Sequence, residues 1–194
     1  MLNVLQQSGR AKWRSACRIG LLWMLLPLAA GAQVERAFED VLMQQLAQLQ
    51  DEPDNLAPFT TDGCSGGLSA AWRSLARALP GFREKYGMQP PWQACCVDHD
   101  RVYWRGPTEN GFERRKAADL KLKQCVMDTG RRLTPRWMAQ HELSPAHVTE
   151  AFAAAAELMY SAVRVGGLPC TPFPWRWGYG WPPCPILEQS LAVP

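Results

Sequence analysis

The fold prediction depends on one short segment, "PPWQACCVDHDRVYW", residues 90–104. It holds two adjacent cysteines, a histidine between two aspartates, and a tyrosine four residues after the histidine. Metal sites, catalytic dyads and disulfide frameworks all use these residue types. The compartment in which the chain folds distinguishes between these three kinds of site, because cysteines stay reduced in the cytosol and pair into disulfides after export.

Residues 1–32 have the composition of a signal peptide. Four basic residues precede the apolar run "IGLLWMLLPLAAGA", which is short for a membrane span. The run ends in Ala30-Gly31-Ala32, a pattern that suits cleavage before Gln33. The alternative is an uncleaved N-terminal anchor. We therefore expect a secreted or periplasmic protein in which residues 33–194 form a single domain.

The charge and the cysteine count narrow the class of protein. Without residues 1–32 the formal charge falls from +3 to about −1, because that segment carries four basic and no acidic side chains. No electrostatic footprint for nucleic acid then remains. An even number of cysteines in an exported chain predicts three disulfides, although six cysteines allow fifteen pairings. The six are Cys64, Cys95, Cys96, Cys125, Cys170 and Cys184.

The hydrophobic pattern predicts a mainly helical, all-α protein, since no stretch shows sustained strand alternation. We expect the helices to end at turn-forming residues, among them Pro80, Gly130 and Gly166. The expected helical ranges are 35–49, 68–79, 92–104, 113–129 and 145–165.

The C-terminal segment "CTPFPWRWGYGWPPCP" is dense in proline, glycine and tryptophan. Cys170 and Cys184 bracket it, which predicts a local disulfide loop over residues 170–184. Its aromatic side chains fit two interpretations, a membrane–water interface or a loop that packs over the domain. They are Trp175, Trp177, Tyr179 and Trp181.

Zinc is the first alternative for the cysteine–histidine cluster. Structural zinc sites use cysteines two to four residues apart, whereas adjacent Cys95 and Cys96 point about 100° apart on a helix. Zinc is therefore disfavoured. On such a helix Cys95 and His99 share one face, and Asp100 and Tyr103 lie with Cys96 on an adjacent face. If both cysteines formed disulfides, the helix would present an imidazole beside a carboxylate with little freedom, as a general base next to a metal ligand requires.

These residues resemble a known family. Cys95-Cys96-x-x-His99-Asp100-x-x-Tyr103 is similar to the active-site helix of the secreted phospholipase A2 family, C-C-x-x-H-D-x-C-Y. Upstream, "DGCSGG" (residues 62–67) looks like the calcium loop of that family. Downstream, Asp119 precedes Cys125 by six residues, as does the aspartate that supports the family's catalytic histidine. The resemblance covers roughly residues 60–130.

The resemblance implies a disulfide-stabilised phospholipase A2-like fold with two antiparallel active-site helices and a calcium loop. It also implies the disulfides Cys64–Cys96 and Cys95–Cys125. If the second of these joins antiparallel helices, His99 and Asp119 lie about 6 Å and about 9 Å beyond it in the same direction, so the two side chains can meet.

The implied activity is calcium-dependent hydrolysis of the sn-2 ester of glycerophospholipids in a membrane surface or micelle, by a monomer. His99 would be the general base, Asp119 would orient it, and Tyr103 would hydrogen-bond that aspartate. Asp100 would bind Ca²⁺ through both carboxylate oxygens. The other implied calcium ligands are backbone carbonyls of Gly63, Ser65 and Gly67, with Asp62 as a side-chain ligand.

Two departures from the family pattern suggest a short, divergent member of bacterial type. Ser65 stands where many members have a glycine, and a positive φ there would be strained, which is why Asp62 enters the ligand set. Val102 replaces the cysteine that usually precedes the tyrosine. The alternatives are a non-catalytic lipid- or protein-binding module on the same scaffold, and an exported domain in which the cluster is accidental.

Overall fold

The computed structural model describes residues 33–63, 67–141 and 143–185. The predicted signal peptide, residues 1–32, lies outside the described residues, as do Cys64 and Ser65. Residues from Asp40 onward cluster into one compact unit. In the described part of the chain, no helix has both the length and the apolar character needed to cross a bilayer.

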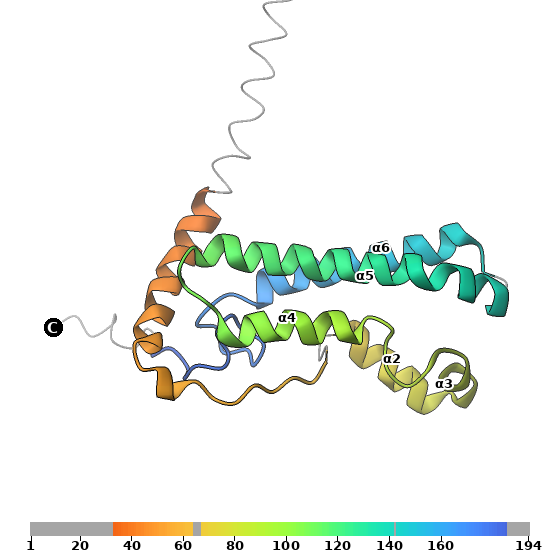
Figure 1. Cartoon of the computed structure of the whole chain (residues 1–194), viewed down its shortest axis with the longest axis horizontal. Helices are drawn as coiled ribbons and strands as arrows, with labels where there is room; N and C mark the ends of the chain where they lie inside the picture. Colours follow the sequence, from red (N-terminus) through yellow and green to blue (C-terminus); the bar gives the residue numbers. More distant parts are fainter. Residues whose placement is uncertain (1–32, 64–66, 142, 186–194) are drawn as a thin grey trace, which may run out of the picture. The chain divides into compact units, whose positions relative to one another are not determined.

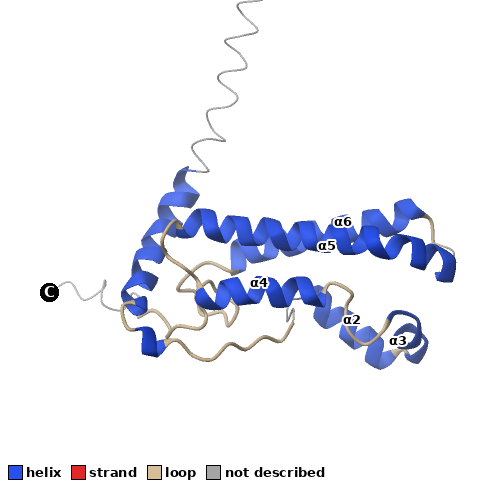
Figure 2. Ribbon diagram, viewed as in Figure 1, coloured by secondary structure: helices blue, strands red, loops and turns tan. Residues whose placement is uncertain are grey.

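The protein is mainly helical, and the described residues contain no strand (Figure 2). This confirms the all-α prediction. A helix over residues 33–50 comes first and is followed by a 3-10 turn, η1. The labelled elements are η1 (Pro53–Asn55), α2 (Gly67–Ala78), α3 (Pro80–Tyr86), α4 (Gln93–Arg105), α5 (Gly111–His141) and α6 (Pro145–Gly166).

The three helices α4, α5 and α6 pack together around the candidate site (Figure 1). The chain reverses between α4 and α5, so the two run antiparallel, and α6 returns along α5. The predicted Cys95–Cys125 disulfide is confirmed and joins α4 to α5 with a Cα–Cα distance of 5.7 Å. Cys96 is disulfide-bonded too. Its predicted partner, Cys64, lies outside the described residues.

Two apolar clusters fix these helices. The larger lies where α4, α5 and α6 meet, and its buried members are Trp92, Cys95, Cys96, Leu122, Val126, Val148, Phe152 and Ala156. The smaller joins residues 43–46 to the C-terminal loop, and its buried members are Met43, Leu46, Tyr103, Ala118, Trp177 and Trp181. Tyr103 belongs to the second cluster, so α4 is held on both sides.

One predicted helix end is wrong. α5 continues through Gly130 to His141, because Gly130 allows α6 to approach closely: a Cβ there would lie 2.5 Å from the side chain of Phe152. The predicted end of the 68–79 helix before Pro80 is confirmed, because α2 ends at Ala78. Pro80 then begins a further helix, α3, where its fixed φ suits the first turn. The predicted end of α6 at Gly166 is confirmed.

The predicted Cys170–Cys184 disulfide is confirmed and closes the C-terminal loop. The Arg176 side chain is buried within this loop and donates to the carbonyl oxygens of Trp181 (2.7 Å) and Pro182 (2.9 Å). The aromatic residues of the loop differ in burial. Trp177 and Trp181 are buried, whereas 41% of Trp175 is exposed.

Candidate active site

The structure brings together the two residues that the sequence paired as base and orienting carboxylate. Nε2 of His99, on α4, lies 2.9 Å from Oδ1 of Asp119, on α5. Both side chains are buried, with 7% of His99 and none of Asp119 exposed. The Cys95–Cys125 disulfide lies one turn away on α4 and fixes the register of the two helices.

Both carboxylate oxygens of Asp119 are engaged. Oδ1, which faces His99, also accepts a hydrogen bond of 2.6 Å from the Tyr103 hydroxyl. Oδ2 lies 3.1 Å from Nη1 of Arg164, on α6, and 3.6 Å from Nη1 of Arg115, on α5. Three helices therefore supply the groups around this one carboxylate.

The groups around His99 affect both its pKa and the ring nitrogen that carries the proton in the neutral form. Burial lowers the pKa of His99, but hydrogen bonding and charge from Asp100 and Asp119 outweigh it and leave the pKa above the ordinary value. In the neutral ring, an ionised Asp119 accepts the proton of Nε2, so the lone pair is on Nδ1. Nδ1 lies 3.9 Å from Oδ1 of Asp100.

Tyr103 is held as a neutral donor. Burial, followed by the negative charge of Asp119, raises its pKa well above the ordinary value, although Arg115 acts in the opposite direction. Its ring lies 4.1 Å from the imidazole of His99, centre to centre. The hydroxyl therefore remains protonated at neutral pH and donates to Asp119.

A hydrogen-bonded chain connects Asp100 to the predicted calcium loop. The Thr61 hydroxyl donates to Oδ2 of Asp100 at 2.5 Å and accepts from the backbone N–H of Gly63 at 3.0 Å. Gly63 has a φ of +61°, a left-handed conformation that favours glycine. The structure thus places Gly63 and Asp100 on either side of Thr61, whereas Gly67 is the first residue of α2.

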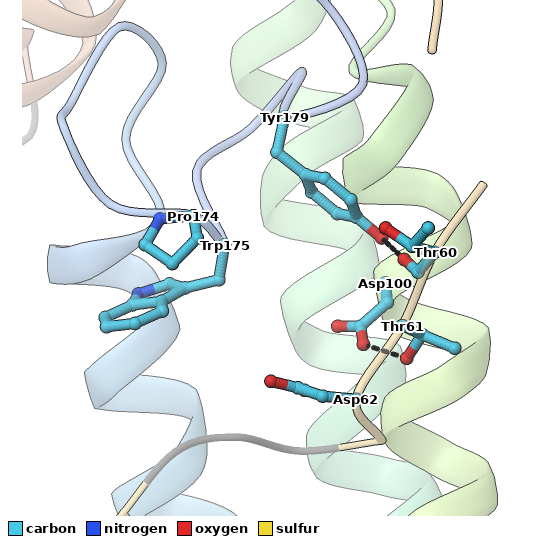
Figure 3. A pocket seen from close by; sticks show the side chains of 7 residues that line it. All are labelled: Thr60, Thr61, Asp62, Asp100, Pro174, Trp175 and Tyr179. Carbon is cyan, nitrogen blue, oxygen red and sulfur yellow. Dashed lines mark hydrogen bonds between the residues drawn. The ribbon is translucent and has the colours of Figure 1, made fainter. Parts of the chain in front are cut away.

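Asp100 also faces a cavity of about 200 Å³ (Figure 3). The wall opposite Asp100 comes from the C-terminal loop, and Asp62 points into the same space (Figure 3). Tyr179 closes one end and donates a 2.7 Å hydrogen bond to the carbonyl of Thr60. The lining residues are Thr60, Thr61, Asp62, Asp100, Pro174, Trp175 and Tyr179.

His99 does not line this cavity. It borders a crevice of about 20 Å³ between α4 and α5, whose walls include Val102, Ala118 and Leu122. Asp100 thus lies between the cavity and His99: its carboxylate faces the larger cavity and is also near Nδ1 of His99.

The donor set around the cavity suits a hard cation. The carboxylates of Asp62 and Asp100 and the hydroxyl of Thr61 are all oxygen donors, as Ca²⁺ prefers. The described residues contain no group of three or more histidine, cysteine, aspartate or glutamate side chains placed to hold a metal. A cation here would therefore also need backbone carbonyls or water. Ser65, one of the predicted carbonyl ligands, lies outside the described residues.

Sequence reasoning did not find all the residues of the site. Thr61 carried no signal beyond its position beside Asp62, and Arg115 is one of several basic residues at the start of α5. Arg164 lies 45 residues from Asp119 and outside the segment that resembles a known family. Trp175 was singled out as an aromatic residue of the tail, but the sequence did not place it opposite Asp100.

Comparisons with protein-family models, curated proteins and solved structures return no match for this chain.

Proposed function

We propose that this protein is an exported, calcium-dependent phospholipase A2 with a phospholipase A2-like fold. It would release the sn-2 fatty acid of a glycerophospholipid and leave a lysophospholipid. One observation carries the proposal: His99 is held against the buried Asp119 at 2.9 Å, while its neighbour Asp100 faces a cavity with a second carboxylate. A general base and a hard-cation ligand on consecutive residues are the requirements of this reaction.

The protein's own groups account for the proton transfers. Nδ1 of His99 accepts a proton from a water molecule as that water attacks the ester carbonyl. Asp119 keeps the proton on Nε2 and stabilises the imidazolium that forms. When the tetrahedral intermediate collapses, the imidazolium returns the proton to the departing glycerol oxygen, so the products are a free fatty acid and an alcohol.

Asp100, Asp62 and backbone carbonyls, including that of Gly63, would hold the calcium ion. When bound there, Ca²⁺ supplies positive charge to the substrate phosphate and to the oxyanion of the intermediate. Thr61 orients Asp100 by its 2.5 Å hydrogen bond to Oδ2.

The C-terminal loop supports a lipid substrate. Trp175 stacks on Phe173 with ring centres 5.1 Å apart, and more than two fifths of each side chain is exposed. Trp175 also lines the cavity that Asp100 faces. An exposed aromatic pair at the rim of the site is suited to a membrane–water interface, where tryptophan is favoured.

The deciding experiment measures fatty-acid release from mixed phospholipid vesicles by the oxidised, purified protein, with Ca²⁺ and then with EGTA. The proposal predicts release from the sn-2 position that requires Ca²⁺. Folded protein that releases no fatty acid from several lipids would instead favour the non-catalytic binding module.

Two substitutions separate the roles of adjacent residues. His99→Gln should abolish turnover and leave the fold and the calcium affinity nearly unchanged, because it removes the base alone. Asp100→Asn should weaken calcium binding directly, measured by calorimetry, because one carboxylate charge is lost. Normal turnover by His99→Gln would show that the base is assigned wrongly.

A further inference from the structure

The C-terminal end of α6 lies against the proposed reaction centre, although no part of α6 belongs to the segment that resembles a known family. Nη1 of Arg164 is 3.1 Å from Oδ2 of Asp119, and only 11% of the Arg164 side chain is exposed. Its guanidinium also lies over the ring of Phe112, 5.4 Å from the ring centre. Arg164 is therefore held on two sides, by a carboxylate and by an aromatic face.

The end of α6 is fixed in place by a second arginine. Nη1 of the buried Arg115 donates to the carbonyl oxygens of Val163 and Arg164, at 3.2 Å each. The last carbonyls of a helix have no partner within the helix, and a cation there also offsets the negative end of the helix dipole. Arg115 thus caps α6 from α5, at the point where α6 meets Tyr103.

Close packing adds to this constraint. Gly167 directly follows α6, and a Cβ at that position would lie 2.6 Å from the Tyr103 ring and 2.8 Å from its hydroxyl oxygen. Only a glycine leaves room for the helix end to sit against Tyr103. The position of Arg164 relative to Asp119 is consequently set by the backbone and not by a flexible side chain alone.

The two carboxylate oxygens of Asp119 contact different groups. Oδ1 receives the hydroxyl of Tyr103 and faces Nε2 of His99. Oδ2 faces the guanidinium of Arg164 at 3.1 Å, and that of Arg115 lies farther away at 3.6 Å. A carboxylate held only at Oδ1 could rotate about its Cβ–Cγ bond, and one without a cation would be costly to bury in its charged form. The ion pair at Oδ2 addresses both difficulties.

We propose that Arg164 is a positioning residue: its ion pair with Oδ2 holds the Asp119 carboxylate in one orientation, so that the His99 proton stays on Nε2 and the lone pair of Nδ1 is available. This inference rests on the proposed function for its effect on turnover. Its effect on the tautomer of His99 is independent of any activity.

The test compares Arg164→Gln with Lys123→Gln. Lys123 is a matched control, because it also forms an ion pair between α5 and α6, with Glu157, and lies over an aromatic ring, that of Tyr160. It does not line the candidate site. Both variants remove one such α5–α6 contact, but only Arg164→Gln removes the closest cation of Asp119.

Two measurements are made on the full chain at fixed pH. With ¹⁵N-labelled histidine, NMR reports the tautomer of His99, assigned with the His99→Gln protein. Arg164→Gln should shift the ring nitrogens away from the pure Nε2–H pattern, whereas Lys123→Gln should not. On vesicles, kcat should fall about 10- to 100-fold with KM unchanged in Arg164→Gln, the usual loss for a residue that supports a reacting group.

A folded Arg164→Gln protein with the wild-type ¹⁵N pattern and kcat would overturn the proposal. If this variant does not fold, Arg164→Lys takes its place, because it keeps the charge but moves it away from Oδ2; an unchanged ¹⁵N pattern there overturns the proposal equally. If the wild-type protein releases no fatty acid, the proposed phospholipase function fails, but the ¹⁵N comparison still decides the role of Arg164.

Discussion

Asp119 is the residue on which most of the site's interactions converge. It is fully buried and is contacted by His99 and Tyr103 from α4, by Arg115 from its own helix and by Arg164 from α6. Burial of a carboxylate is costly unless the charge is paired and hydrogen-bonded, and here both requirements are met. The removal of any one partner should therefore be measurable in the stability of the whole protein.

Tyr103→Phe tests one of these partners. The substitution removes the 2.6 Å hydrogen bond to Asp119 and the hydroxyl that Arg115 contacts at 3.3 Å. We expect the free energy of unfolding to fall by about 1.5–3 kcal/mol, the range for a hydrogen bond to a charged group. Urea denaturation measures this. Tyr160→Phe, at a half-buried tyrosine on α6, should change the stability by less than about 0.5 kcal/mol. If Tyr103→Phe were as stable as the wild-type protein, the proposed contribution of the Tyr103–Asp119 hydrogen bond to stability would be contradicted.

At the same scale, the sequence predicted part of the Asp119 environment but not all of it. His99 and Asp119 could be paired because helix geometry converts a six-residue spacing from Cys125 into a distance along α5. Arg164 could not be found this way, since its contact with Asp119 depends on how α6 packs against α5. Arg115 looked like any basic residue on a solvated helix face, and only the structure shows that none of it is exposed.

At the scale of elements, the packing of α5 against α6 explains why the sequence misplaced the end of α5. A glycine after an amphipathic segment is typical of a helix end, but the same residue also permits close helix–helix contact. At Gly130 the second role applies, because Phe152 of α6 occupies the space that a side chain would need. Sequence alone does not distinguish these two uses. α4 was easier to predict, because prolines precede it and Gly106 follows it.

Gly130→Ala tests the close approach of α5 and α6. A Cβ 2.5 Å from the Phe152 side chain should force the helices apart and destabilise the protein by about 1–3 kcal/mol, the usual cost of overpacking. The higher helix propensity of alanine, worth up to about 1 kcal/mol, acts in the opposite direction. Gly81→Ala in α3 is the control, because no atom lies within 4 Å of the added Cβ. If thermal unfolding showed that both substitutions stabilise, the close packing would be refuted.

At the scale of the whole molecule, the candidate site depends on segments far apart in the chain. The segment leading to Gly63 is tied to the C-terminal loop by the hydrogen bond from Ala57 N–H to the Gly180 carbonyl, at 2.9 Å. It is tied to α4 by the Trp104 indole, which donates to the Ala57 carbonyl at 2.8 Å. The cavity beside Asp100 therefore depends on the segment before Gly63, on α4 and on the C-terminal loop together.

Replacement of Cys170 and Cys184 by alanine tests the contribution of the C-terminal loop. The disulfide joins residues 14 apart, and loss of such a constraint on the unfolded chain costs about 3 kcal/mol. We expect urea denaturation to show a loss of this size. Because Trp175 lines the cavity and is exposed at its rim, we also expect KM for vesicles to rise more than kcat falls. A loss of stability with unchanged KM would show that the loop has a structural role only.

Calcium should stabilise the whole molecule if the cavity is its site. Asp62 and Asp100 place two negative charges on one cavity, and a cation that binds there only in the folded state shifts the equilibrium towards that state. At a calcium concentration 100 times the dissociation constant, the free energy of unfolding should rise by about 2.7 kcal/mol. Thermal unfolding with Ca²⁺ and with EGTA measures the shift. Asp100→Asn should remove most of it, whereas Asp98→Asn, at an exposed position on the same helix, should retain it. A calcium-induced shift that survives Asp100→Asn in full would place the ion elsewhere in the protein.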